Sequence, residues 1–299
     1  RIEAGRAQNG IVRSYFLPTV SGSLSNAPNP SASSDSSYSL GAVLNWELDI
    51  FGKIRRENQA AMAELLATED GARAVMASLV ATTTSSWLNL RALDQELAIT
   101  KANIVSQEES LALVRSLLKG GVANGADEQQ AIAQLAFTRS RQPQIEQAIV
   151  ATENALSLLL GAQPGPIIRD TAAAMPQTPA LPKTGLPSEL LARRPDVSAA
   201  EQLLVAATAR IGVAIANRFP VPTIGLSGFI GLIGINLGDT LGNDGATQSV
   251  TSWGPDMVLP LIDWGRAHNR VRGARANAEI AALNYRAIVL NALREVSDA

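Results

Sequence analysis

Residues 38–50 read YSLGAVLNWELDI, and this stretch decides the kind of fold. Its positions alternate between two classes. The even positions are Tyr38, Leu40, Ala42, Leu44, Trp46, Leu48 and Ile50, and the odd positions are Ser39, Gly41, Val43, Asn45, Glu47 and Asp49. Because successive side chains of a strand point to opposite faces, this period of two predicts a strand with one apolar face and one small or polar face.

Three further segments, residues 19–25, 223–232 and 251–261, show the same alternation. In the last of these, Trp253 and Met257 share the apolar parity, and Asp256 falls on the other. Phe229 interrupts the pattern of the middle segment. The segments form two pairs, residues 17–50 and 221–262. Their intervening loops, 29–37 and 238–248, are rich in Ser, Gly, Asp, Asn and Thr, as turns are.

Two environments produce strands of this kind. One is a soluble antiparallel sheet with one face on a core. The other is a transmembrane barrel, whose apolar face meets lipid and whose polar face lines water. The barrel interpretation predicts lipid contact for Tyr38, Leu40, Leu44, Trp46, Trp253 and Met257, and water contact for Asn45, Glu47, Asp49 and Asp256. Four strands cannot close a barrel, and lipid does not tolerate open edges, so a barrel would require an oligomer.

A long helix is predicted between Lys53 and Lys119, where there is no Pro and Gly71 is the one Gly. At 1.5 Å per residue, such a helix would be roughly 100 Å long. Leucine or isoleucine recurs every seventh residue, at Leu90, Leu97, Ile104, Leu111 and Leu118. A strict seven-residue period favours coiled-coil packing, although a long helix in a soluble bundle has the same spacing.

The segment 120–125, GGVANG, separates this helix from a second helical pattern at residues 127–160. Glycines and an Asn between two helices predict an αα-hairpin turn. We expect Gly121 and Gly125 to adopt angles that favour glycine, and Asn124 and Asp127 to cap the second helix. Pro143 should kink or divide that helix.

One unit occurs twice in the chain: a helix end, Pro-Thr, two strands, an aromatic-Gly-basic triplet and a long helix. The triplets are Phe51-Gly52-Lys53 and Trp264-Gly265-Arg266. We therefore predict a first repeat at 1–160, with its helical hairpin at 53–160, and a truncated second repeat at 188–299. Between them, residues 161–187 are rich in Pro and predict an irregular connector that either is a disordered linker or wraps the helices.

Composition argues against several functions. A net charge of −2 gives no electrostatic basis for binding nucleic acid. The chain has no Cys, and its single His, His268, falls in a predicted helix, where a structural or solvated role is the ordinary one. Glu108 and Glu109 are adjacent on a helix and do not converge. We expect no enzyme activity, no cofactor and no metal site.

Segments from across the chain resemble the TolC-like outer-membrane efflux channels, close to the lipoprotein branch. They are LLARRPDVSAAE (190–201), ARIGVAIANRFP (209–220), PLIDWGR (260–266), ALREV (292–296) and GVANGADEQQA (121–131). The residues that match the family signature are Arg193, Arg194, Pro195, Asp196, Glu201, Trp264, Gly265 and Arg266. Asn124 and Ala126 depart from the family's hairpin turn, which has Ser and Leu there. Without the resemblance, Pro195 and Asp196 predict a helix start, and Arg193 and Arg194 a solvated helix end.

The resemblance implies a mixed α and membrane β fold. Three chains would each give four strands to one trimeric outer-membrane β-barrel, continued by a coiled-coil α-helical barrel across the periplasm. The connector would be part of a belt around it. Family members extend beyond both ends of this sequence, so we expect a leader, any acylated N-terminal Cys and a second hairpin to lie outside it.

The implied function is that of an outer-membrane exit duct in a Gram-negative bacterium. It would passively conduct drugs, metals or other solutes delivered by an inner-membrane pump through a periplasmic adaptor. The resemblance implies that the adaptor docks on the hairpin tip: Gly121, Val122, Ala123, Asn124, Gly125 and Asp127. The alternative is a soluble trimeric coiled-coil scaffold or adaptor without channel activity.

Overall fold

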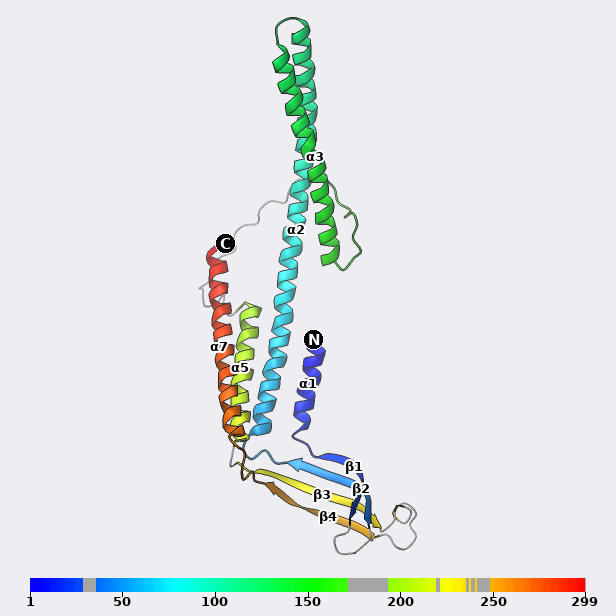
Figure 1. Cartoon of the computed structure of the whole chain (residues 1–299), viewed down its shortest axis with the longest axis vertical. Coiled ribbons are helices and arrows are strands. Elements are labelled where there is room, and N and C mark those ends of the chain that lie inside the picture. The colour runs from blue at the N-terminus through cyan, green and yellow to red at the C-terminus, as the bar shows by residue number, and fades with distance from the viewer. Residues whose placement is uncertain are drawn as a thin grey trace. The chain divides into compact units, whose positions relative to one another are not determined.

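The structure is a computed structural model that describes residues 1–28, 36–171, 193–218, 221–234, 237, 240 and 248–298 (Figure 1). The chain divides into two compact units, Arg1–Ala74 with Gly185–Ala299, and Val75–Thr184. The first unit holds all four strands. The second holds most of a helical hairpin. The predicted loops at 29–37 and 238–248 lie largely outside the described residues, as does the connector beyond residue 171.

The four strands form one antiparallel sheet in the order β1-β2-β3-β4. They are β1 (Thr19–Pro28), β2 (Ser36–Glu47), β3 (Thr223–Gly234) and β4 (Gln248–Val258). All four predicted strands are present; β1 and β3 run a few residues further than the sequence indicated, whereas β2 and β4 end three residues earlier. Because β2 pairs with β3, the two pairs join in a single sheet at its centre.

The strand register gathers the apolar residues on one face. Leu40 lies between Leu24 and Leu232, and Leu44 lies between Val20 and Gly228. We call this the apolar face; it carries Val20, Leu24, Tyr38, Leu40, Ala42, Leu44, Trp46, Ile224, Leu226, Ile230, Leu232, Trp253 and Met257. The opposite face, which we call the polar face, carries Thr19, Ser21, Ser23, Ser39, Asn45, Glu47, Thr223, Ser227, Ser252 and Asp256, with the apolar Val43, Phe229, Ile233, Val250 and Val258 among them. The predicted period of two is confirmed.

The apolar face is not a protein core in this chain. Trp253 is 81% exposed and Ile230 is 61% exposed, and Val20, Leu24 and Met257 are exposed as well. A soluble sheet would bury these side chains against a second layer, since each is worth about 1.5–3 kcal/mol when removed from water. The exposure therefore favours a sheet whose apolar face is covered by something other than this chain.

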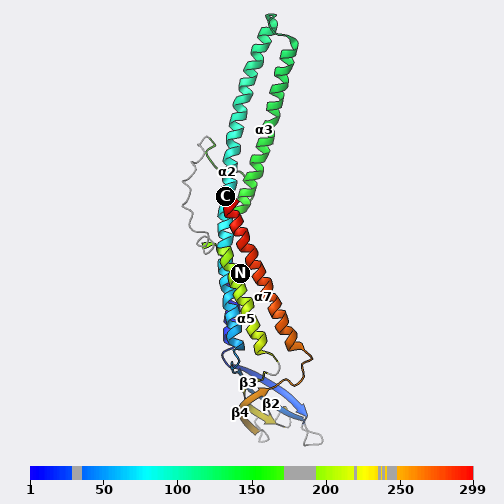
Figure 2. The same ribbon diagram turned by 90° about the vertical axis from the view of Figure 1, so that its left-hand side faces the viewer.

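Four helical segments accompany the sheet in the first unit: α1 (Ile2–Ser14), the start of α2 (Lys53–Lys119), α5 (Pro195–Ala216) and α7 (Arg266–Asp298). Figure 1 and Figure 2 show α5 and α7 side by side. The buried centre consists of alanines, Ala60 and Ala63 of α2 against Ala206 and Ala209 of α5. Small side chains let helix backbones approach closely, which explains the alanine-rich, aromatic-poor composition.

Helix α5 is also, among the described helices, the one long and apolar enough to cross a membrane, with a mean hydropathy of 1.4 over its most apolar window. In the structure Ala206 and Ala209 face α2, and α5 packs along α7. Helix packing therefore accounts for this composition.

In the second unit, α2 continues to Lys119 and turns into α3 (Gly125–Leu159). Leu90 and Leu111 are buried, and the other residues of the seven-residue series are half-buried. On α3, Leu135, Ile145 and Leu156 are buried. The heptad prediction is confirmed. Pro143 lies inside α3 without dividing it. Proline has no N–H to donate to the carbonyl four residues earlier, but Pro143 is exposed, so water can bond that carbonyl instead.

Residues 163–171 form an extended strap attached to this hairpin. Gly165, Ile167 and Arg169 are half-buried, whereas Pro166 and Ile168 between them are exposed. The Ile167 N–H donates to Glu153 of α3 at 3.4 Å, and Ser157 Oγ donates to the Gly165 carbonyl at 3.3 Å. Of the two alternatives for the connector, a free linker is therefore wrong for its described part.

Arg169 fastens the strap through buried charges. Its Nε and Nη2 donate to the two oxygens of Asp94 at 2.7 and 2.8 Å, and Nη1 donates to Glu153. Arg91 adds an ion pair to Asp94 at 3.3 Å and donates to the Asp170 carbonyl at 2.6 Å. The hydrogen bonds that Arg169 donates to Asp94 raise the pKa of Arg169, outweighing burial, which lowers it. We call Arg91, Asp94, Glu153 and Arg169 the charge cluster.

The predicted boundaries at 160 and 188 follow sequence repetition and not contact. The strap packs on the helices before it, and the two strand pairs lie in one unit. The element order α1-β1-β2-α2 followed, after α3, by α5-β3-β4-α7 nevertheless repeats helix, strand, strand, helix. The division into two repeats thus remains a prediction about how the sequence is built.

Candidate functional site

The hairpin tip is a compact turn with a defined backbone. Gly121 has a φ of 75°, and its N–H donates to Leu118 at 3.1 Å while that of Val122 donates to Leu117 at 2.9 Å. These two bonds form a Schellman motif that ends α2 and needs a left-handed residue. The expectation for Gly121 is confirmed. That for Gly125 is wrong, because Gly125 is already the first residue of α3.

The start of α3 is capped as the sequence indicated. Asn124 Oδ1 accepts from the Asp127 N–H at 3.0 Å, and Asp127 Oδ2 accepts from the Asn124 N–H at 3.0 Å. This capping box satisfies two backbone donors that the helix leaves unpaired. Arg115 and Glu128 bridge the two helices at 2.9 Å, and Val122 at the apex is 78% exposed. The tip is therefore ordered without burying its own side chains.

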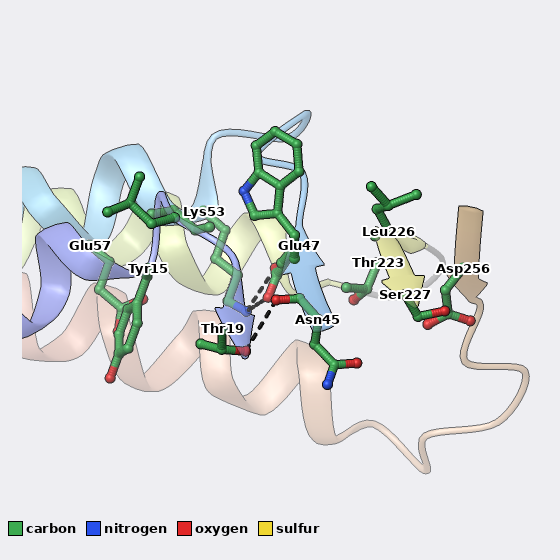
Figure 3. A pocket seen from close by; sticks show the side chains of 14 residues that line it. Tyr15, Thr19, Asn45, Glu47, Lys53, Glu57, Thr223, Leu226, Ser227 and Asp256 are labelled. Carbon is green, nitrogen blue, oxygen red and sulfur yellow. Dashed lines mark hydrogen bonds and ion pairs between the residues drawn. The ribbon is translucent and has the colours of Figure 1, made fainter. Parts of the chain in front are cut away.

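A cavity of about 500 Å³ lies where the sheet meets the helices (Figure 3). Figure 3 shows Leu226 pointing to one side of the sheet and Asn45 and Asp256 to the other, as the register requires. Trp46 is the cross-strand partner of Leu226 and shares its face. Lys53 of α2 reaches Glu47 at 2.9 and 3.0 Å. One predicted water-facing acid is therefore neutralised by an ion pair. Asp256 lies in the same cross-strand row as Glu47, through Gly225, and is exposed.

Asp49 was grouped with the water-facing strand residues, and the structure places it elsewhere. Strand β2 ends at Glu47, and Asp49 accepts from the N–H groups of Ile54 and Arg55 at 2.9 Å each and from Arg55 Nε at 3.0 Å. Burial raises the pKa of Asp49, but these hydrogen bonds together lower it by more, so the pKa lies below the usual value for an aspartate. Asp49 therefore stabilises the start of α2.

The link from β4 to α7 is built like the link from β2 to α2. Asp263 accepts from the N–H groups of Gly265 and Ala267 at 3.0 and 2.9 Å, and these bonds lower its pKa. Ile54 and Ala267 each lie two residues after a left-handed glycine, Gly52 (φ 76°) or Gly265 (φ 79°). We call residues 47–56 the first junction and residues 259–270 the second junction.

Two of the family-signature residues, Arg194 and Asp196, connect α5 to Glu295 of α7; we call these three residues the clasp. Pro195 begins α5, with Asp196 in its first turn, as expected. Arg194 donates to both oxygens of Asp196 at 3.1 and 2.8 Å and to Glu295 of α7 at 2.7 Å. The hydrogen bonds that Arg194 donates to Asp196 and Glu295 raise the pKa of Arg194, and those it donates to Asp196 lower the pKa of Asp196. A solvated helix end is thus wrong for Arg194, whereas Arg193 is exposed.

Parts of the signature do not join the clasp. Glu201 is exposed on α5, and Trp264, Gly265 and Arg266 belong to the second junction. Residues 190–192 and 219–220 of the matching segments lie outside the described residues. No spacing in the sequence could have paired Arg194 with Glu295, since the contact depends on how α5 packs along α7.

Phe229, which breaks the alternation of β3, fills a gap that sequence reasoning missed. Gly41 and Gly231 lie opposite each other on the polar face. A Cβ on either glycine would meet the Phe229 ring at 2.7 Å. The ring therefore covers two glycines on neighbouring strands, as aromatic residues do beside glycines in other sheets. A glycine pair across two strands, with an aromatic residue nearby, is the signal that could have found it.

Comparison with known proteins agrees with this architecture. The outer membrane efflux protein family matches residues 1–162 and 186–299. Outer membrane protein OprJ of Pseudomonas aeruginosa is 34% identical over all of this chain, which covers 64% of that protein. Solvent efflux pump outer membrane protein SrpC of Pseudomonas putida is 33% identical over 99% of the chain, which again covers 64% of the relative.

Solved structures extend the likeness to three dimensions. The outer-membrane channel OprN has a TM-score of 0.89 at 33% identity, covering 100% of this chain and 68% of its own. A CusC structure has a TM-score of 0.85 at 28% identity, covering 99% of this chain and 69% of its own. Measured against the full sequences of OprJ and SrpC, the chain spans 64%, which is less than two thirds. With nearly all of its residues matched, the chain belongs to the outer membrane efflux protein family.

Proposed function

We propose that the protein to which this chain belongs is the outer-membrane exit duct of a tripartite efflux system. The observation that carries this proposal is the exposed apolar face of the sheet, with Trp253 81% and Ile230 61% exposed. Lipid would cover these side chains at no cost in polar contacts. The polar face would line water, so that Asn45, Glu47 and Asp256 contact the lumen while Tyr38, Leu40, Leu44, Trp46, Trp253 and Met257 contact lipid.

The sheet's free edges support a homotrimer. Within the described sheet, β1 and β4 each pair on one side only. An unmet backbone group costs several kcal/mol in hydrocarbon, so the edges must pair with other copies. Three chains of four strands would close one barrel, and the long helices would continue the duct into the periplasm. A soluble trimeric scaffold is the alternative, and it leaves the apolar face uncovered.

The duct would conduct solutes passively from an inner-membrane pump through a periplasmic adaptor. Relatives bear the names cation efflux system protein CusC and toluene efflux pump outer membrane protein TtgI. Since those names point to different solutes, we assign this chain no single substrate class. The adaptor would dock on the hairpin tip, whose apex residue Val122 is exposed on an ordered turn.

Spin labels along β2 test the barrel. Labels at Leu40 and Leu44 should contact lipid, and labels at Ser39 and Asn45 should contact water, because the register places these pairs on opposite faces. The protein should require detergent for purification and crosslink as a trimer. Uniform accessibility along the strand, or a stable inserted monomer, would contradict the proposal.

A second experiment tests docking at the tip. Val122→Trp enlarges an exposed side chain without changing the left-handed backbone of Gly121. We expect normal trimer yield with loss of solute export and of adaptor crosslinking. Leu113→Trp, at another exposed apolar site on α2, is the matched control and should export normally. Export at the wild-type level by Val122→Trp would show that the turn only joins two helices.

A further inference from the structure

The two junctions follow the same backbone plan but differ in how their cations are paired. At the first junction, Lys53 pairs with Glu47 at 2.9 Å and Arg55 pairs with Asp49 at 3.0 Å. At the second, Arg266 and Arg270 are exposed, and the described part of the chain places no carboxylate within ion-pair distance of either. At the first junction two of the three cations are thus paired, while Arg56 donates to the neutral Gln59. At the second junction neither arginine has a carboxylate partner among the described residues.

The one acid within the second junction, Asp263, does not remove this charge. Asp263 is close enough for Arg266 and Arg270 to lower its pKa. Both of its oxygens, however, already accept backbone N–H groups, from Gly265 and Ala267. Arg266 and Arg270 are four residues apart and share a helix face, where like charges repel. Anions placed between them would relieve that repulsion.

A second, independent observation points to the kind of anion. Leu261, Ile262 and Trp264 directly precede the arginines and are 78%, 71% and 91% exposed. Trp264 has a φ of 53°, a left-handed angle that residues with a side chain rarely adopt. A strained backbone thus holds a large apolar ring in solvent. An apolar cluster beside free cations matches a membrane interface, where Trp lies at headgroup level and basic residues meet phosphates.

We propose that the second junction binds anionic phospholipid headgroups of the leaflet that faces the periplasm. This rests on the proposed function, because it takes β4 to span the membrane. Strand β4 ends at Val258 and α7 begins at Arg266, so Arg266 follows the segment that leaves the sheet, and Arg270 comes about one helical turn later. Leu261, Ile262 and Trp264 enter the boundary with the acyl chains, and Arg266 and Arg270 bind the phosphates.

Lipid selectivity of the whole protein tests the assignment. The protein is reconstituted into phosphatidylcholine vesicles that hold spin-labelled phosphatidylglycerol or spin-labelled phosphatidylcholine, and the protein-bound fraction is measured. We expect a preference for phosphatidylglycerol that Arg266→Gln/Arg270→Gln lowers by about fivefold for each arginine lost. The matched control, Lys53→Gln/Arg55→Gln at the first junction, removes two cations that carboxylates already pair, and it should keep the preference. High salt should abolish the preference in the unmodified protein, whereas millimolar inorganic phosphate should not.

Each other result overturns the assignment. Equal preference in both double variants would remove it, as would a preference that does not depend on salt. Crosslinking of residue 266 to a second copy in every lipid would show that protein covers this surface instead. Failure of the unmodified protein to insert would contradict the proposed function itself, whereas insertion without lipid preference contradicts only this inference.

Discussion

The sheet and the helical hairpin differ in which side chains they expose to solvent and which they bury. The sheet exposes large apolar side chains, among them Trp253 and Ile230. The hairpin with its strap buries charge: the side chains of Asp94 and Arg169 are 3% and 7% exposed. A buried charge needs its partners within the same unit, and the cluster has them. An exposed apolar face needs its partner from outside.

The difference separates what the chain can complete alone from what it cannot. The strap, α2 and α3 satisfy one another through the charge cluster and the heptad core. Among the residues that the structure describes, the sheet has neither a second layer on its apolar face nor partners for the outer edges of β1 and β4. The stability of the hairpin should therefore depend on its own contacts, and that of the sheet on its surroundings.

The largest expected effect is at the charge cluster. Asp94→Ala leaves Arg91 and Arg169 buried without their shared carboxylate, and removing one partner of a buried ion pair costs about 3–5 kcal/mol. Native-state hydrogen exchange at the Ile167 N–H should report a loss of that size in local opening free energy. Glu96→Gln, in an exposed pair with Arg141, is the control and should change it by less than about 1 kcal/mol. Equal effects would mean that burial adds nothing to the cluster.

A somewhat smaller effect is expected on the sheet, and only in a membrane. Leu44→Arg on the apolar face should lower the unfolding free energy of the inserted protein by about 2–4 kcal/mol, because lipid offers the charge no partner. Asn45→Arg on the adjacent, polar face should have little effect. Reversible unfolding from vesicles measures both. If the two substitutions cost the same, the faces do not differ in environment.

The smallest effect is at the hairpin tip. Asn124→Ala removes the side-chain half of the capping box and should cost about 1 kcal/mol, confined to the first turn of α3. Exchange at the Asp127 N–H should accelerate, while exchange at Ile145 stays unchanged. Acceleration that spreads to Ile145 would show that the hairpin opens as one cooperative unit.

Much of this fold followed from periodicity. The two-residue period in β2 and the seven-residue series from Leu90 are direct records of which side chains share a face. Alternation also excludes a one-residue slip, which would move every apolar side chain to the other face, but a two-residue slip keeps the faces, so the register is known only from the structure. The capping of α3 by Asn124 followed from local chemistry alone.

Contacts between distant segments did not follow. The charge cluster joins Asp94 to Arg169, and the clasp joins Arg194 to Glu295. Such pairs depend on helix packing, which leaves no fixed spacing in the sequence. Asp49 was misplaced for a related reason: its parity fits the polar face, but the strand ends two residues earlier and the carboxylate caps α2. Parity identifies a face only while the strand continues.

The pairing of β2 with β3 also bears on the order of folding. Their partners, such as Leu40 and Leu232, come from opposite halves of the sequence, with the whole helical hairpin between them. Contacts so far apart carry a large loop-closure entropy, and chains dominated by them fold slowly. The contacts of α2 with α3 are closer in sequence and should form first. A partly folded chain would then have a complete helical hairpin and two separate strand pairs. Its apolar strand side chains would come together on one face only when β2 pairs with β3.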